Sequence, residues 1–197
     1  MPNPEAEPRT RDRIVDASAA LFAHRGYAGT GLKAIVAASD APFGSLYHFF
    51  PGGKEELGTA AIEAGGAVYR RLVEDCFPAG ADVVAATAAF FSGAGEVLRA
   101  SDFADACPIA TIALEVASTS EPMRLAAAAA FESWLAVLQL RFVEAGMPAA
   151  TAREVAVESF CAVEGAFLFS RTNRTTEALE IAGRAAAARV AAALASA

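Results

Sequence analysis

The most constraining stretch of the sequence is a pair of short helical patterns separated by only three residues. The first pattern covers residues 31–38, the link is residues 39–41, and the second pattern covers residues 42–50. Proline suits the first turn of a helix because its missing N–H would have no partner there, so Pro42 marks a helix start. A short helix, a tight turn and a second helix together predict a helix-turn-helix.

The second helix of this pair is expected to bury one face and expose the other. Successive residues of a helix turn by about 100°, which places Leu46 and Phe49 on one side. The opposite side carries Phe43, Gly44, Tyr47 and His48, with Ser45 at its edge. Hydroxyl, imidazole and bare backbone groups can bond phosphates or base edges. A helix of this length spans roughly 12–13 Å and matches a B-DNA major groove about 12 Å wide, so the pattern predicts contact with DNA.

A threonine stands at the expected N-terminal end of each of the first two helices. A first helix is expected from Thr10, which can cap it, to Gly26, which ends it. Thr30 precedes the helical pattern of residues 31–38 and is expected to be its N-cap. The same position could present the positive end of that helix to a phosphate.

The remainder of the sequence predicts helices and no strands. A long helix is expected from Lys54 to about residue 77, where the Pro-Gly-containing residues 78–80 break it. Further helical patterns cover residues 82–100, 108–117, 121–145, 149–171 and 176–195, and Thr151 with Glu154 matches a capping box. This predicts an all-α fold. An N-terminal helix-turn-helix domain of three helices would cover residues 1–54, and a C-terminal bundle of about six helices would cover residues 55–197.

The net charge of −7 is unusual for a protein that binds nucleic acid, so its distribution matters. Residues 9–54 hold six Arg and Lys against three Asp, whereas the residues after 54 hold ten Arg and Lys against eighteen Asp and Glu. Exposed charges separated by more than about 8 Å are largely screened at physiological salt. The local, modestly positive balance of the first domain therefore permits contact with phosphates.

On these residues the sequence resembles the TetR/AcrR family of bacterial transcriptional regulators. The resemblance is carried by the pattern of residues 10–26, Tyr27, Thr30, residues 44–50 and the Lys-Glu-Glu-Leu of residues 54–57. The turn at residues 51–54 and the Cys-Pro-Ile-Ala of residues 107–110 resemble the subgroup that represses multidrug-exporter genes. The resemblance implies a dimer that binds a palindromic double-stranded DNA operator and leaves it when a small apolar effector binds the second domain.

Two positions depart from the family pattern, which often has Lys or Arg where Phe43 stands and His where Phe49 stands. Lys54 matches the family's phosphate anchor, although a lone surface lysine is commonly just solvated. The candidate DNA-binding residues are Thr30, Lys33, Phe43, Gly44, Ser45, Tyr47, His48 and Lys54.

The second domain is rich in large apolar residues at helical spacing, and most of these must form a core. The resemblance implies an effector pocket among its middle helices, and such a pocket needs apolar walls with few inward polar groups. The candidate ligand-binding residues are Phe90, Phe91, Thr111, Ile112, Glu115, Trp134, Glu164 and Phe167. Glu115 and Glu164 stand alone in apolar runs, so each is either a pocket acid or an outward-facing, solubilising group.

Small residues recur along the last two helical patterns, namely Ala162, Gly165, Ala166, Gly183 and Ala186. They would allow two helices to approach closely. The resemblance implies that these helices pair with a second subunit as a four-helix bundle, and we expect a homodimer through them. A solvent-exposed, alanine-rich helix is the alternative, but the scarcity of charge disfavours it.

The sequence favours no catalytic, metal or cofactor site. His24 and His48 are the only histidines, and neither has a second ligand at metal spacing. The Gly-Gly-Lys of residues 52–54 lacks the remaining residues of a phosphate-binding loop. Neither a metal, a cofactor nor an enzymatic activity is expected.

Membrane and export signals are also missing from the pattern. No run reaches the ~18 apolar residues of a membrane span. Residues 1–8 carry three prolines and two glutamates and are expected to form a disordered lead-in. The three cysteines, Cys76, Cys107 and Cys161, predict a reduced cytoplasmic protein with buried, inert thiols, the alternative being a redox sensor.

Taken together, these patterns predict a cytoplasmic TetR-type repressor. One alternative is a helical carrier or enzyme whose helix-turn-helix is inactive. A second is a DNA-binding protein that responds to no ligand, which a densely filled core would indicate.

Overall fold

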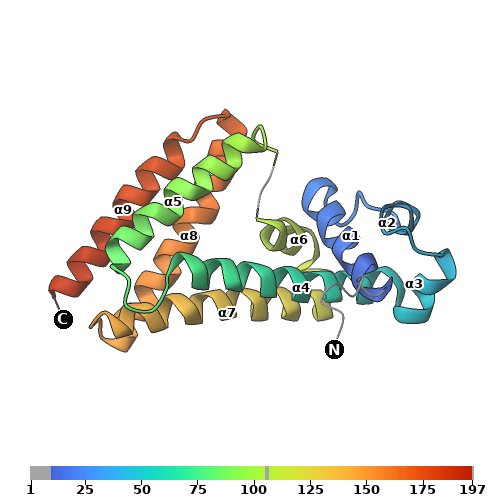
Figure 1. Ribbon diagram of the computed structural model, residues 1–197, viewed down its shortest axis with the longest axis horizontal. Helices are drawn as coiled ribbons and strands as arrows, with labels where there is room; N and C mark the ends of the chain where they lie inside the picture. Colours follow the sequence, from blue (N-terminus) through green and yellow to red (C-terminus); the bar gives the residue numbers. More distant parts are fainter. Residues whose placement is uncertain (1–9, 105–106, 197) are drawn as a thin grey trace, which may run out of the picture. The chain divides into compact units, whose positions relative to one another are not determined.

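The chain is all-α, as predicted. The computed structural model describes residues 10–104 and 107–196, and within these ranges it forms nine helices and no strand (Figure 1). The helices are α1 Thr10–Arg25, α2 Leu32–Ala38, α3 Phe43–Phe49, α4 Gly53–Cys76, α5 Val83–Ala100, α6 Pro108–Val116, α7 Glu121–Glu144, α8 Ala149–Asn173 and α9 Glu177–Ala195. Their ends agree with the sequence patterns to about two residues. The disorder expected for residues 1–8 lies outside the described residues.

Two compact units make up the fold. The first, here called the N-terminal unit, comprises the chain up to Gly65 together with Pro108–Ala128. The second, the C-terminal unit, comprises Gly66–Cys107 and the chain from Ala129 onward. This division differs from the domain boundary expected after residue 54, because the start of α4, all of α6 and the start of α7 belong to the N-terminal unit.

The core of the N-terminal unit joins α1, α2 and α3. Ile14 and Phe22 of α1, Ile35 of α2 and Leu46 of α3 are completely buried, and Phe50 closes the cluster behind α3. Burying each such side chain contributes about 1.5–3 kcal/mol. The helical spacing of these residues thus fixes the orientation of α3 through its inner face.

The turn between α2 and α3 is fastened to α1 by an arginine. Arg13 donates from Nε to the carbonyl oxygen of Ser39 at 3.2 Å and from Nη2 to that of Asp40 at 3.5 Å. Asp40 has a left-handed backbone with φ of 49°, a conformation that Asp adopts more readily than most residues. One of the six basic residues of this region therefore holds the turn.

The capping predictions for Thr30 and Thr151 are wrong. Gly31 is the N-cap of α2 and no side chain caps it, while Thr30 is only 1% exposed and donates from Oγ1 to the carbonyl oxygen of Gly26 at 2.8 Å. The extended Pro148 starts α8 at Ala149, so Thr151 lies inside the helix. The N-caps are therefore Gly31 and Pro148, and neither is the residue that the sequence pattern favours.

In the C-terminal unit, α9 packs against both α5 and α8 (Figure 1). A Cβ at Gly183 would lie 2.7 Å from the Cβ of Phe91, so α5 and α9 are in contact through a position that has no room for a side chain. Ala166 and Ala186 belong to the same buried cluster. The prediction of a contact with a second subunit is therefore corrected for Ala166, Gly183 and Ala186, which pack within the chain, whereas Gly165 is exposed.

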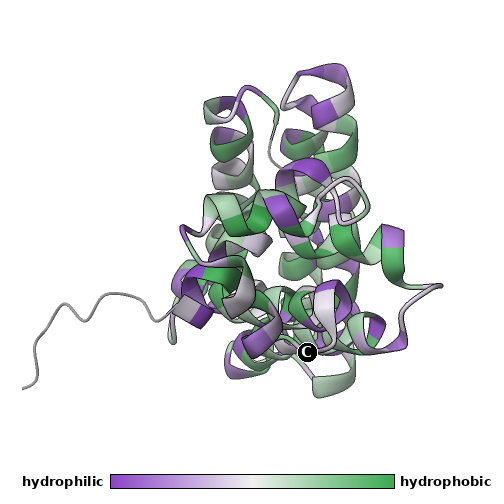
Figure 2. Ribbon diagram, turned by 90° about the vertical axis from the view of Figure 1, so that its right-hand side faces the viewer, coloured by the Kyte–Doolittle hydropathy of each residue, from purple (hydrophilic) through white to green (hydrophobic). Residues whose placement is uncertain are grey.

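Polar and apolar residues are mixed along the helices (Figure 2), yet two helices pass a membrane-span test of length and composition. These are α5 and α7, whose most apolar windows are 28% and 44% buried inside the structure. Core helices of soluble proteins have the same length and composition. The absence of a membrane-spanning segment stays a prediction.

Candidate nucleic-acid interface

The outer face of α3 is exposed as its periodicity predicts. Phe43 is 45% and Tyr47 50% exposed, and Gly44 and His48 are exposed beside them. Leu46, on the opposite side, is completely buried. The helix therefore offers a contiguous surface of two aromatic rings, an imidazole and bare backbone, while its inner face anchors it.

The exposed rings contact one another along the helix. The ring centroids of Phe43 and Tyr47 lie 5.8 Å apart with planes tilted by 56°. His48 packs edge-on against Phe49 at 4.9 Å, and Phe49 is half-buried. Nothing lies within 4 Å of where a Cβ of Gly44 would be, so that position is open to an approaching partner.

The two lysines predicted to contact DNA have different surroundings. Lys33 is exposed on α2. Lys54 is half-buried, with its Nζ 4.3 Å from the ring centroid of Tyr27, a cation–π contact. Burial lowers the pKa of Lys54, and the carboxylate of Glu115 acts in the opposite direction. A phosphate contact by Lys54 would have to be made from this position on the tyrosine.

Glu115 has a structural role that sequence reasoning missed. Its carboxylate on α6 accepts hydrogen bonds from the backbone N–H groups of Tyr27 at 2.9 Å and Ala28 at 2.8 Å, just after α1. A Cβ at Gly26 would lie 2.2 Å from its Oε1, so the glycine makes room for the carboxylate. Glu115 is exposed, as its outward-facing alternative expects, and its carboxylate also links α6 to the turn after α1 within the N-terminal unit. No local pattern could reveal a bond between residues 88 positions apart.

The eight residues predicted to bind a ligand are divided between the two units. Thr111, Ile112 and Glu115 lie on α6 in the N-terminal unit, where Ile112 is part of the buried core. The remaining five, in the C-terminal unit, are Phe90, Phe91, Trp134, Glu164 and Phe167. Phe91 is buried against Gly183, and Phe90 and Phe167 pack on the same cluster.

Trp134 of α7 is enclosed by other aromatic rings. Its ring centroid lies 5.4 Å from that of Phe131, 6.0 Å from that of Phe160 and 5.7 Å from that of Tyr69. Its Nε1 donates to the carbonyl oxygen of Gly66 at 2.8 Å. The indole therefore joins α4, α7 and α8 within the C-terminal unit.

Glu164 of α8 is a carboxyl in an apolar setting. Burial raises its pKa, and a hydrogen bond with Cys107 partly opposes this rise. Cys107 is itself buried, Cys76 is half-buried, and Cys161 is exposed, so the prediction of buried thiols is wrong for Cys161. Among the residues that the structure describes, the three thiols form no disulfide.

Replacing Glu164 with glutamine is expected to change how stability depends on pH. Because the folded pKa of Glu164 is raised, its favourable contribution is complete below the unfolded pKa and is lost as pH rises through the folded value. Between about pH 4.5 and pH 8, the free energy of unfolding should therefore fall further in the wild type than in Glu164→Gln. Urea unfolding measures both, with the exposed Glu154→Gln on the same helix as control. Parallel profiles would contradict the placement of Glu164.

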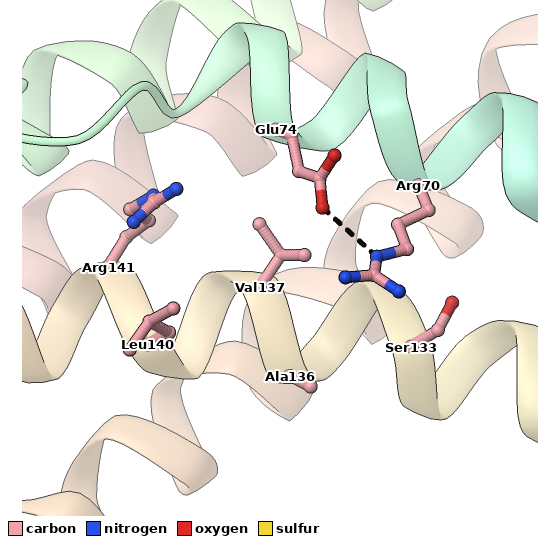
Figure 3. A pocket seen from close by; sticks show the side chains of 7 residues that line it. All are labelled: Arg70, Glu74, Ser133, Ala136, Val137, Leu140 and Arg141. Atoms are coloured by element: carbon pink, nitrogen blue, oxygen red, sulfur yellow. Dashed lines mark hydrogen bonds and ion pairs between the residues drawn. The ribbon is translucent and has the colours of Figure 1, made fainter.

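A surface pocket of about 210 Å³ opens between α4 and α7 in the C-terminal unit (Figure 3). Val137 and Leu140 of α7 form its apolar wall, and the ion pair between Arg70 and Glu74, 3.0 Å from Nε to Oε1, closes one side. None of the eight predicted ligand residues lines it. The pocket therefore gives no support to the ligand-binding list.

Comparison with known proteins identifies the class to which this arrangement belongs. Residues 14–61 match the family described as "Bacterial regulatory proteins, tetR family", and residues 83–185 match "Transcriptional regulator LmrA/YxaF-like, C-terminal domain". A helix-turn-helix with an exposed second helix thus belongs to a DNA-binding regulator. The chain is a member of the TetR family of bacterial transcriptional regulators.

Relatives and solved structures agree with this assignment. The chain is 33% identical to the uncharacterized HTH-type transcriptional regulator YxaF of Bacillus subtilis, over 84% of this chain and 86% of that one. It is 32% identical to the B. subtilis regulator LmrA, over 86% and 90%. Its fold is similar to a TetR regulatory protein from Rhodobacter sphaeroides, with a TM-score of 0.80 at 24% identity over 92% and 99% of the chains. Reduced E. coli NemR has a TM-score of 0.79 at 23% identity over 91% and 95%.

Proposed function

We propose that the protein is a cytoplasmic, homodimeric repressor whose two α3 helices enter successive major grooves of a palindromic operator, about 34 Å apart. The observation that carries this proposal is the outward face of α3, with Phe43, Gly44, Tyr47 and His48 exposed over a buried Leu46. Ser45 lies on the same helix, Lys33 is exposed on α2, and Lys54 follows at the start of α4. The hydroxyl of Thr30 is removed from the proposed contacts because it is buried.

Gly44→Ala tests the proposal without harming the fold. At both Gly44 and Gly93 of α5, nothing lies within 4 Å of the point where the methyl group of an alanine would sit, and alanine favours a helix by about 1 kcal/mol over glycine. Both substitutions should therefore raise stability. Only Gly44→Ala should weaken a specific band in a gel shift with DNA from upstream of the gene, because it adds a methyl group at the surface facing DNA. Equal binding by both variants would contradict the placement of α3.

Phe43→Lys is expected to tighten DNA binding and to steepen its dependence on salt. Lysine at this exposed position can neutralise one more phosphate, which would raise the slope of log affinity against log salt by about 0.9. Binding titrations between low and moderate salt measure the slope, and Phe43→Leu is the uncharged control. An unchanged slope for Phe43→Lys would count against the expectation that a lysine side chain at position 43 can reach a phosphate.

The dimer contact proposed for α8 and α9 uses their remaining exposed side chains. Since Ala166, Gly183 and Ala186 are occupied within the chain, the outward apolar residues are Leu168, Phe169 and Ile181, with Cys161 and Gly165 beside them. Exposed apolar residues gathered on two helices are typical of a protein interface. Light scattering at micromolar concentration should give the mass of a dimer for the wild type and of a monomer for Phe169→Glu. A monomeric wild type would refute the dimer.

A small apolar effector bound in the C-terminal unit is proposed to release the DNA. The aromatic side chains around Trp134 are apolar, and the half-buried Glu164 of the same unit is a polar group, a combination that suits such a ligand. Trp134 is the only tryptophan, so its fluorescence reports binding nearby. Effector candidates that change this emission should also lower operator affinity, and a ligand that does the first without the second would not be the effector.

A further inference from the structure

The two exposed rings on α3 are unusual for a surface that meets DNA. Phe43 and Tyr47 lie one helical turn apart, are about half exposed and contact each other at 5.8 Å. A phenyl ring has neither a hydrogen-bond donor nor an acceptor, so the side chain of Phe43 cannot bond a phosphate or the polar edge of a base. Its contribution to binding has to come from an apolar contact.

The major groove of B-DNA presents one apolar group on its base edges, the C5-methyl group of thymine. We infer that Phe43, supported by the ring of Tyr47, packs on a thymine methyl group and so selects thymine at one position of each operator half-site. This inference rests on the proposed function, in which α3 is the helix that enters the groove.

The structure holds the pair in a position suited to such a contact. Leu46 and Phe50 are buried beneath α3, so the helix cannot turn its rings inward without exposing them. Contact with Tyr47 restricts the ring of Phe43 on one side. Gly44 has no side chain to keep the helix away from the groove, and its surroundings are open. The rings are therefore presented on a rigid support with free access.

Replacement of thymine by deoxyuridine tests the inference, because it removes only the methyl group. A binding site is first selected from random duplex DNA with the full-length protein, and each thymine is then replaced singly. Loss of one buried methyl group should weaken wild-type binding about three- to fivefold at one symmetric pair of positions. At the remaining thymines the replacement should have no effect.

Variants then identify the residue that reads the methyl group. Phe43→Ala should bind thymine and deoxyuridine sites equally, whereas Tyr47→Phe, which keeps the ring, should still discriminate. If Phe43→Ala binds too weakly to measure, Phe43→Leu keeps an apolar contact and should retain part of the discrimination. Full discrimination by Phe43→Ala would overturn the inference, as would equal wild-type affinity for all singly replaced sites.

Failure of thymine recognition can be told apart from failure of the proposed function. Selection that yields a specific site at which no thymine methyl group matters overturns the inference and leaves α3 as the reading helix. Selection that yields no specific site at all overturns the proposed function, and the inference with it.

Discussion

The free energy of unfolding should fall by about 3–5 kcal/mol when Trp134 is replaced by alanine. Trp134 is 4% exposed and its indole packs against Phe131, Phe160 and Tyr69. Alanine would leave a cavity where α4, α7 and α8 meet and would remove the hydrogen bond to the carbonyl oxygen of Gly66. Urea unfolding followed by circular dichroism, at one fixed protein concentration, measures the loss.

Trp134→Phe and Val97→Ala complete this experiment. Phenylalanine keeps most of the ring contacts but not the Nε1 hydrogen bond, so its loss should be smaller, about 1–3 kcal/mol. Val97 is exposed on α5, so Val97→Ala should change stability by no more than about 0.5 kcal/mol. A loss for Trp134→Ala no greater than that of Val97→Ala would show that the indole does not support the core. Because Trp134→Phe is expected to fold but lacks the fluorescent indole, the effect of an effector on this variant has to be followed through its operator affinity.

Leu46→Ala and Tyr47→Ala, neighbours on α3, should differ in their effects on stability and DNA binding. Leu46 is completely buried, so its replacement should lower the free energy of unfolding by about 2–5 kcal/mol. It should also lower DNA affinity, because α3 loses its anchor. Tyr47→Ala, at the exposed side, should leave stability within about 0.5 kcal/mol of the wild type and weaken specific DNA binding by about 1–3 kcal/mol.

Thermal unfolding and DNA titration of Leu46→Ala and Tyr47→Ala distinguish the contribution of the inner face of α3 from that of its outer face. Retention of full affinity by Tyr47→Ala would show that α3 faces elsewhere in the complex. A stable Leu46→Ala protein would show that the inner face of α3 is not what holds the helix.

Helix positions were predictable from the sequence because local signals determine them. Pro42 marks the start of α3, and the apolar spacing of residues such as Leu46 identifies the buried face. The caps were less predictable. Thr30 has the side chain of a cap, but the turn places its hydroxyl on the carbonyl of Gly26, which only the folded backbone reveals.

Part of the candidate site was also predictable from local signals, and part was not. The outward face of α3 follows from a period of about 100° per residue, whereas the residues of an effector pocket depend on which helices become neighbours. Glu115 and Glu164 looked equivalent in the sequence, as single acids in apolar runs. Glu115 bonds a distant backbone turn, whereas Glu164 is half-buried and hydrogen-bonded to Cys107. Similarly, Gly183 is matched to Phe91 by packing and not by any motif.

The carboxylate of Glu115 also fixes the position of α6 along its axis relative to the turn after α1. Each residue of a helix advances about 1.5 Å along the axis. The two hydrogen bonds from Tyr27 and Ala28 to Glu115, 2.9 and 2.8 Å long, would break if α6 slid by the length of one residue. A sliding α6 must therefore either break charged hydrogen bonds or carry the loop after α1 along with it. A side chain at position 26 would occupy the space of the Glu115 carboxylate. A substitution of Gly26 is therefore expected to displace α6, although α6 lies far from Gly26 in the sequence.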